Sequence, residues 1–221
     1  MDTDLKVEFH CHTVYSKDSL TSPESLLATC RRKGIDRVII TDHNTIAGAR
    51  EAQALDPERV IVGEEIMTSQ GELLAAFVQE EIPPGLEPRK VISLLREQGA
   101  FISVSHPFDR LRSGHWRTAD LLEIIDLVDA IETYNARCMW PGFNREAAIF
   151  ARDQKLEGTV GSDAHAPFEL GKATILLPHF DDATSLKNVL SQGRPQVSLS
   201  PPWVHLTSRY AVWRKRITSR R

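Results

Sequence analysis

The chain has 221 residues and a formal net charge of −3, and 41% of its residues are apolar, which suits one globular domain with a substantial core. No apolar run reaches the roughly 18 residues of a membrane span, and the start MDTDLKVEF lacks both the basic and the apolar part of a signal peptide, so we expect a cytoplasmic protein. The three cysteines include no CxxC spacing, which argues against a disulfide framework and against a cysteine-ligated zinc site.

Basic residues are concentrated at the C-terminal end of the sequence. Residues 206–221 hold six basic residues and no acidic one, which leaves 21 basic against 30 acidic residues in the rest of the chain. An acidic body lacks the general footprint of a nucleic-acid-binding protein, whereas a basic segment can contact RNA, a membrane or a neighbouring subunit, or simply be solvated. We therefore expect a folded domain over residues 1–205 and a basic tail over residues 206–221.

Apolar, β-branched runs bounded by turn residues predict strands along most of the chain. In chain order they read LKVEFH, RVIIT, RVIVGEE, LLAAFV, AFISVSH, AIETY, GTVGS and ATILL. Only a short segment separates the third run from the fourth, which predicts a hairpin there.

Helices are predicted between most of these strands. The clearest covers residues 23–33, because Ser22 is a typical N-cap, Pro23 suits the first helical position and Gly34 follows the last turn. Others are expected over residues 46–54, 88–98, 118–127, 144–154 and 182–191. The alternation predicts mainly parallel strands with helices outside, and we expect a single-domain α/β fold whose seven strands form a distorted TIM-like (β/α)7 barrel.

Histidines and carboxylates recur where the predicted strands end. In strand order they are His10 and His12, Asp42 and His43, Glu64 and Glu65, His106, Glu132, and Asp163 and His165. One such residue is more often a helix cap or a hydrogen-bonded core residue than a ligand. Repetition on separate strands of a barrel predicts a shared site, because the carboxyl ends of these strands meet at one face.

The residue types at these strand ends favour metal chemistry. His10 and His12 lie two apart on a strand, so their side chains leave the same face while Cys11 points away. Imidazole and carboxylate together suit zinc, manganese or iron, and Glu65 and Asp163 can bridge or cap adjacent ions. Ions about 3.5 to 4 Å apart would clamp the attacking and leaving oxygens at phosphorus and activate a bound water as hydroxide, which predicts phosphoester hydrolysis.

Six segments resemble, in order, the motifs of the PHP (polymerase and histidinol phosphatase) family of metal-dependent phosphoesterases. They are FHCHT, ITDHNTIAG, GEEI, SHP, IETYNAR and GSDAH, and the resemblance runs over residues 8–172. It implies a distorted seven-stranded barrel that holds two or three divalent ions, usually zinc, manganese or iron.

The resemblance also implies ligands for each ion. For the first ion these are His10, His12, Glu65 and Asp163, with Glu65 as a bridge. The second would use Glu65 and His106, with Glu132 as an addition at a position whose identity varies within the family. The third would use Asp18, His43 and His165, and some members have a histidine where Asp18 stands.

Further residues are candidates for catalysis and substrate binding. The catalytic candidates are Asp42, His43, Asp163 and His165. Asp42 could orient His43 or handle the leaving-group proton, and these alternatives stay open. The phosphate-binding candidates are Lys17, Arg110 and Arg137, each close in sequence to an expected ligand, although each could equally be a solvated surface charge. We treat His115, His179 and His205 as ordinary loop or surface histidines.

We expect a phosphatase that hydrolyses phosphomonoesters of a small molecule such as a nucleotide, a sugar phosphate or histidinol phosphate, because the chain is short and its body acidic. A nuclease that trims DNA or RNA ends is an alternative, favoured by the basic tail. A non-catalytic metal-binding or interaction module is another, but a polar ligand stands at every motif position that can be matched.

Overall fold

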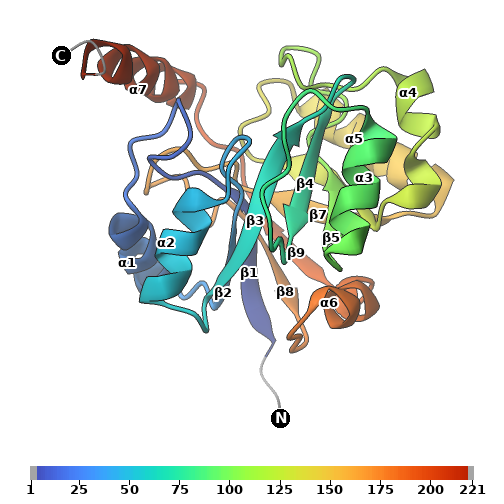
Figure 1. The fold of residues 1–221 in the computed structure, drawn as a ribbon, viewed down its shortest axis with the longest axis horizontal. Helices are drawn as coiled ribbons and strands as arrows, with labels where there is room; N and C mark the ends of the chain where they lie inside the picture. Colours follow the sequence, from blue (N-terminus) through green and yellow to red (C-terminus); the bar gives the residue numbers. More distant parts are fainter. Residues whose placement is uncertain (1–3, 219–221) are drawn as a thin grey trace.

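A computed structural model describes residues 4–218, and its centre is a curled nine-stranded sheet (Figure 1). The strands are β1 (Leu5–Cys11), β2 (Arg37–Ile40), β3 (Val60–Met67), β4 (Glu72–Ala76), β5 (Phe101–Val104), β6 (Ala130–Asn135), β7 (Glu157–Gly161), β8 (Ala173–Leu177) and β9 (Arg194–Val197). The helices are α1 (Pro23–Lys33), α2 (Ala47–Leu55), α3 (Pro88–Glu97), α4 (Thr118–Leu122), α5 (Pro141–Gln154), α6 (Ala183–Leu190) and α7 (Val204–Thr218), with a 3₁₀ turn over Ile125–Leu127.

The sheet order is β7-β6-β5-β4-β3-β2-β1-β8-β9. Pairing is parallel from β1 to β3 and from β5 to β7, while β4 is antiparallel to both its neighbours, which confirms the predicted hairpin. The sheet curls until the end of β1 meets the residues after β7. There the His12 N–H donates to the Ala164 carbonyl at 2.8 Å, and the Ala164 N–H donates to the His10 carbonyl at 3.3 Å. The α/β barrel fold is therefore confirmed.

The number of strands differs from the prediction, because the sheet has nine rather than seven. β8 and β9 extend it beyond β1 in antiparallel pairing. β8 corresponds to the predicted ATILL run. β9 was missed because its sequence, RPQV, has no apolar run, and all four of its residues are exposed.

Packing across the barrel shows what fills its interior. Phe9 of β1 and Phe101 of β5 are separated by three strands in the sheet, yet their ring centroids lie 6.4 Å apart. They belong to a buried cluster with Ile39, Ile61 and Val160. A larger cluster joins the outer helices to the other face of the strands. The polar strand ends therefore lie above a solid apolar base.

Most helices begin and end near the predicted residues. Ser22 accepts the Ser25 N–H, and Gly34 ends α1 in a left-handed conformation with φ 61°, as the sequence predicts. The helix expected over residues 118–127 is instead α4 followed by the 3₁₀ turn. The helix expected from residue 144 begins earlier, at Pro141, a residue that suits the first turn because it lacks an N–H.

The described part of the basic segment near the C-terminus lies in helix α7, which was not predicted from the sequence. Val204 and Ala211 of α7 are buried, and the Lys215 ammonium donates to the carbonyls of Val14 and Ser16, both at 2.5 Å. The two last basic residues, Arg220 and Arg221, lie outside the described residues, as does the start of the chain before Asp4. No helix within residues 4–218 is long and apolar enough to span a bilayer.

Candidate metal centre

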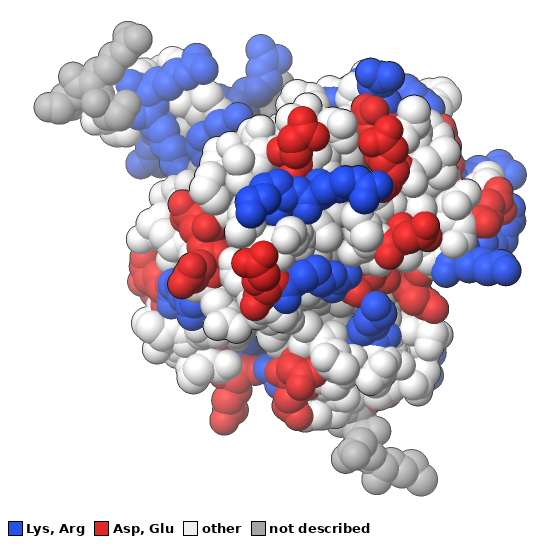
Figure 2. Space-filling model, turned by 45° about the vertical axis from the view of Figure 1, so that its right-hand side comes forward, with Lys and Arg blue, Asp and Glu red and all other residues white. Residues whose placement is uncertain are grey.

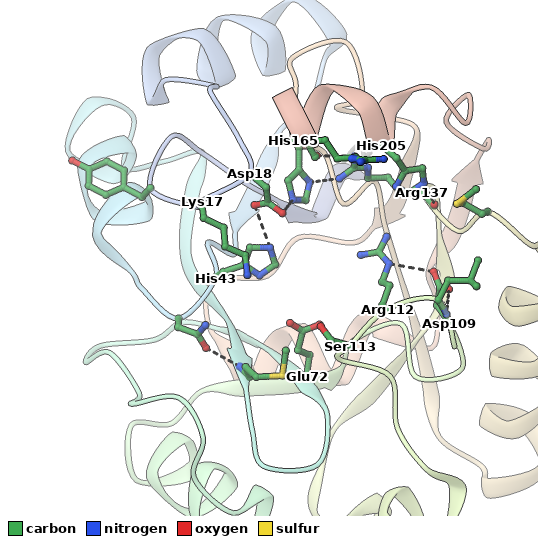
Figure 3. Close-up of a pocket in the computed structure, with 17 residues that line it drawn as sticks. Lys17, Asp18, His43, Glu72, Asp109, Arg112, Ser113, Arg137, His165 and His205 are labelled. Atoms are coloured by element: carbon green, nitrogen blue, oxygen red, sulfur yellow. Dashed lines mark hydrogen bonds and ion pairs between the residues drawn. The ribbon is translucent and has the colours of Figure 1, made fainter. Parts of the chain in front are cut away.

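A cavity of about 700 Å³ opens at the carboxyl ends of the barrel strands (Figure 3). Asp18, His43 and His165 lie on one side of it, and Glu72 and Arg112 lie on the other. Helix α7 runs along the rim above His165. The predicted side chains from separate strands therefore do meet at one end of the barrel.

Four buried donor atoms cluster at the base of this cavity. Nε2 of His10 and Nε2 of His12 are 3.1 Å apart, and each lies 3.4 Å from Oε2 of Glu65. Oδ1 of Asp163 lies 3.7 Å from the first nitrogen and 3.3 Å from the second. Ligands about 2.0 to 2.1 Å from a tetrahedral ion would be separated by roughly 3.3 Å. The spacing of the four atoms therefore fits a single transition-metal ion.

Neighbouring side chains hold the two histidines so that Nε2 of each faces the cluster. Nδ1 of His10 lies 3.0 Å from Oε1 of Glu132. Nδ1 of His12 lies 3.1 Å from Oγ of Ser16, and this hydroxyl donates to Oδ1 of Asp42 at 2.6 Å. In the tautomers that these contacts favour, Nδ1 carries the proton and the Nε2 lone pair is free for a metal.

Several buried polar atoms around the cluster make no hydrogen bond within residues 4–218, although most of them lie in ion-pair range of a neighbouring side chain. They are Oδ1 of Asp18, Oε2 of Glu65, Nδ1 of His106, Oδ1 of Asp163 and Nε2 of His165. A buried polar atom without a partner is costly, so such atoms are rare in proteins. All of them belong to residues predicted as metal ligands. Bound cations would satisfy four of the five atoms, all except Nδ1 of His106. The imidazole and carboxylate groups at this site are therefore suited to bind metal ions.

Two further groups of donor atoms adjoin the first. Nε2 of His106 lies 3.1 Å from Oε1 of Glu65, so this carboxylate has one oxygen in each of two groups. On the opposite side, Asp18 lies between two histidines, 3.5 Å from Nε2 of His43 and 3.2 Å from Nε2 of His165. This arrangement offers places for more than one ion.

Comparison with known proteins identifies this architecture. The sequence model of the PHP domain matches residues 8–105, and that of a PHP-associated region matches residues 141–195. An uncharacterized protein of Methanocaldococcus jannaschii is 37% identical over 145 residues, which cover 60% of this chain and 82% of the relative. The chain belongs to the PHP family. It is a metal-dependent phosphoesterase.

Solved structures share the PHP fold at low sequence identity. A two-domain protein of Bacteroides vulgatus, described as containing a predicted PHP-like metal-dependent phosphoesterase, aligns with a TM-score of 0.71 and 20% identity over 88% of this chain and 65% of its own. The lesion-specific endonuclease PfuEndoQ of Pyrococcus furiosus aligns with a TM-score of 0.58 and 13% identity over 90% of this chain and 59% of its own. The chain thus spans less than two thirds of either protein.

Buried charged side chains in the PHP site shift one another's pKa values. Burial alone would lower the pKa of His10, but the carboxylates of Glu65 and Asp163 hold it well above its usual range. Burial together with the neighbouring His165 and His43 lowers the pKa of His12. The pKa of Asp163 is held well below its usual range, against the effect of burial, by Arg112 and His10. Asp163 is therefore an anion, as a ligand must be.

The three predicted phosphate-binding residues lie in different surroundings. Lys17 lines the cavity. Arg137 also lines it but is buried, 3.1 Å from Glu169 and 2.7 Å from Nδ1 of His165. Arg110 is about half exposed, does not line the cavity, and makes a two-point ion pair with Glu146 at 2.6 and 2.9 Å.

Asp42 and Glu132 contact other side chains and backbone rather than the open cavity. Asp42 is fully buried and accepts hydrogen bonds from Thr13 and Ser16. The second oxygen of Glu132 accepts the His106 N–H at 2.9 Å. Both carboxylates therefore lie where they orient the histidines that form the cluster.

Among the cavity-lining residues that sequence reasoning missed are Glu72, Arg112 and His205. Arg112 lies six positions after His106, so the rule that selected Arg110 would have selected it too. Glu72 begins β4 and its Oε2 lies 3.4 Å from Nε2 of His106, but the pairing of β4 with β5 that brings them together leaves no local signal. His205 was treated as an ordinary surface residue, yet its ring packs near the rim, with Nε2 3.1 Å from the Arg137 carbonyl.

Proposed function

We propose that this PHP-family enzyme hydrolyses phosphomonoesters of a small molecule, such as a nucleotide, a sugar phosphate or histidinol phosphate. The observation that carries the proposal is the cavity itself. Its volume of about 700 Å³ suits one small ligand, and four cationic side chains line it, Lys17, Arg112, Arg137 and Arg209. A phosphate placed above the donor cluster would meet positive charge on several sides.

We further propose two or three ions, chosen among zinc, manganese and iron because the donor set combines imidazoles with carboxylates. The first would be held by His10, His12, Glu65 and Asp163. The second would be held by Glu65 and His106, with Glu132 nearby, and the third by Asp18, His43 and His165. When bound, such ions polarise the phosphoryl oxygens and lower the pKa of water near phosphorus.

The protein side chains have separate roles in this proposal. His43 and His165 line the cavity, so they are the catalytic candidates that face the substrate, while Asp163 completes the first donor group at its base. Asp42 acts as a positioning residue, because it reaches His12 through Ser16 and does not line the cavity. Arg112 and Lys17 bind the phosphate, since both residues line the cavity.

A panel of phosphate esters that includes oligonucleotides tests the substrate class, using protein reconstituted with each metal. We expect turnover of small phosphomonoesters that is lost on chelation. His12→Ala and Asp163→Asn should each lower kcat by several orders of magnitude and lower the metal content. His179→Ala is the control, because its side chain is 57% exposed and pairs only with the exposed Asp181 among the contacts described. Less than about one ion per chain after metal-replete expression would contradict the multinuclear site.

A nuclease is the second candidate, and one feature favours it. Arg209 lines the cavity, and Arg214 follows on the same basic helix, so a chain of phosphates could leave the cavity along α7. Oligonucleotide binding that weakens steeply with salt would support this alternative. Turnover of small esters without such binding would exclude it.

A further inference from the structure

Helix α7 presents two apolar faces, of which one is buried against the protein and the other is largely exposed. Val204 and Ala211 are buried against the body. Leu206, Tyr210, Trp213 and Ile217, with Trp203 just before the helix, form what we call the outer stripe, and these residues are 44% to 62% exposed. Trp203 packs in part on the body, with its ring centroid 5.1 Å from that of Phe168. The spacing of the stripe residues alternates between three and four residues, which places them along one side of a helix. An exposed stripe of this kind marks an interaction surface.

The charges beside the outer stripe are all positive. At 100° per residue, Arg209 and Arg214 lie on opposite sides of the stripe, and both are exposed. The sequence has no acidic residue between Trp203 and the C-terminus. In Figure 2, Lys and Arg side chains gather on this helix at the upper left, whereas the body mixes both signs. The stripe therefore fits an occupant that carries negative charge.

A second copy of α7 does not meet this requirement. The three-four spacing would let two stripes pack as in a coiled coil, with Arg209 and Arg214 at the flanking positions of both helices. No contact between flanking positions of the two copies would then pair opposite charges. Contacts between two arginines would be destabilising. The charge pattern argues against self-pairing through α7.

We propose that the outer stripe docks this enzyme on an anionic lipid bilayer. Tryptophan and tyrosine prefer the boundary between headgroups and acyl chains, and flanking arginines bind anionic headgroups. In Figure 1, α7 stands at the edge of the molecule and projects beyond the barrel, so a flat surface can approach it. A projecting helix with an exposed apolar stripe and flanking cations suits a bilayer surface.

Docking would also orient the catalytic cavity. Ser208 and Arg209 of the same helix line the cavity rim. Because a helix with its side chains is about 10 Å across, the rim would lie within roughly that distance of the headgroups. This inference goes beyond the proposed function and does not depend on the identity of the substrate.

Vesicle binding by the full chain tests the proposal. We expect co-sedimentation with vesicles that contain about 30% phosphatidylglycerol at 0.1 M salt, little binding to pure phosphatidylcholine, and a blue shift of tryptophan emission on binding. Trp213→Ala with Tyr210→Ala should weaken binding about tenfold, because both changes remove aromatic area from the stripe. Arg214→Gln should weaken it by roughly fivefold at 0.1 M salt, since one cation near an anionic surface contributes about that factor.

The matched control is Trp140→Ala, which removes an equally exposed tryptophan, 66% against 58%, outside α7. It should leave vesicle binding unchanged, and the stripe variants should keep the wild-type melting temperature and wild-type turnover of a soluble ester. Failure of the wild type to bind anionic vesicles would overturn the proposal and favour an acidic protein partner. Equal binding to neutral vesicles would overturn the role of the arginines. A dimer that dissociates on Trp213→Ala would instead assign the stripe to a second copy.

Discussion

Nη1 of Arg112 lies 2.5 Å from Oδ2 of Asp163, while the other oxygen of this carboxylate faces His10 and His12. One guanidinium at the open cavity thus contacts the base of the donor cluster. We predict that Arg112→Lys lowers kcat/KM for a small phosphate ester by about tenfold or more, mainly through KM, because an ammonium cannot make the two-point contacts of a guanidinium.

The control for Arg112 lies in the same loop. Arg117 is 79% exposed and pairs with Asp120 at the start of α4. Arg117→Lys should leave both kinetic constants unchanged. Equal losses in the two variants would mean that the loop needs its arginines for folding rather than for phosphate binding.

Asp18 should be needed for one ion but not for the others. It lies between His43 and His165, at 3.5 and 3.2 Å, and is not part of the group formed by His10, His12 and Glu65. We predict that Asp18→Ala lowers metal content by about one ion per chain and lowers kcat/KM while some activity remains. Asp18→His should retain the ion. Full metal content and normal kinetics in Asp18→Ala would make Asp18 a loop residue.

Ser16 should influence metal affinity without touching a metal. Its hydroxyl lies between Asp42 and Nδ1 of His12, so Ser16→Ala removes the contact that orients the ring and one of the hydrogen bonds that Asp42 accepts. Loss of such a partner typically costs 10- to 100-fold in metal affinity. We expect that decrease in a chelator competition assay. Ser16→Thr keeps a hydroxyl and should restore part of the affinity, which a purely structural defect would not predict.

At the opposite end of the barrel, Asp129 should contribute to stability rather than to catalysis. Its side chain is only 3% exposed and pairs with Arg96 at 2.6 Å and Lys187 at 2.8 Å. Burial alone would raise the pKa of Asp129, but these two partners hold it below its ordinary value of 3.8. A carboxyl with a depressed pKa stabilises the fold above its unfolded pKa and loses this contribution as pH falls through the folded pKa.

Asp129→Asn therefore should lower the free energy of unfolding by about 1 to 2 kcal/mol at pH 7, measured by urea denaturation. The difference from the wild type should shrink as pH falls below about 4, because the carboxyl of the unfolded chain is then protonated, and it should be lost once pH falls through the lower pKa of the folded Asp129. Turnover at pH 7 should be unchanged. A difference that stays constant down to pH 3 would show that the charge of Asp129 is not the cause.

The strand ends and the residue types placed there were predictable from the amino-acid sequence. His10, His12, Glu65 and His106 could be assigned to one site because each follows an apolar run, and the carboxyl ends of parallel barrel strands meet at one face. Local spacing was sufficient there, since a strand fixes which neighbouring side chains share a face.

Which other residues reach the site depends on how distant parts of the chain pack together. Arg112 comes from an irregular loop, Glu72 from a strand that runs antiparallel to its neighbours, and α7 from a segment that the sequence alone described as a tail. Their positions depend on packing between parts of the chain far apart in sequence. Such packing leaves no periodic pattern in the residues themselves, and for that reason the base of the site was predictable while much of its rim was not.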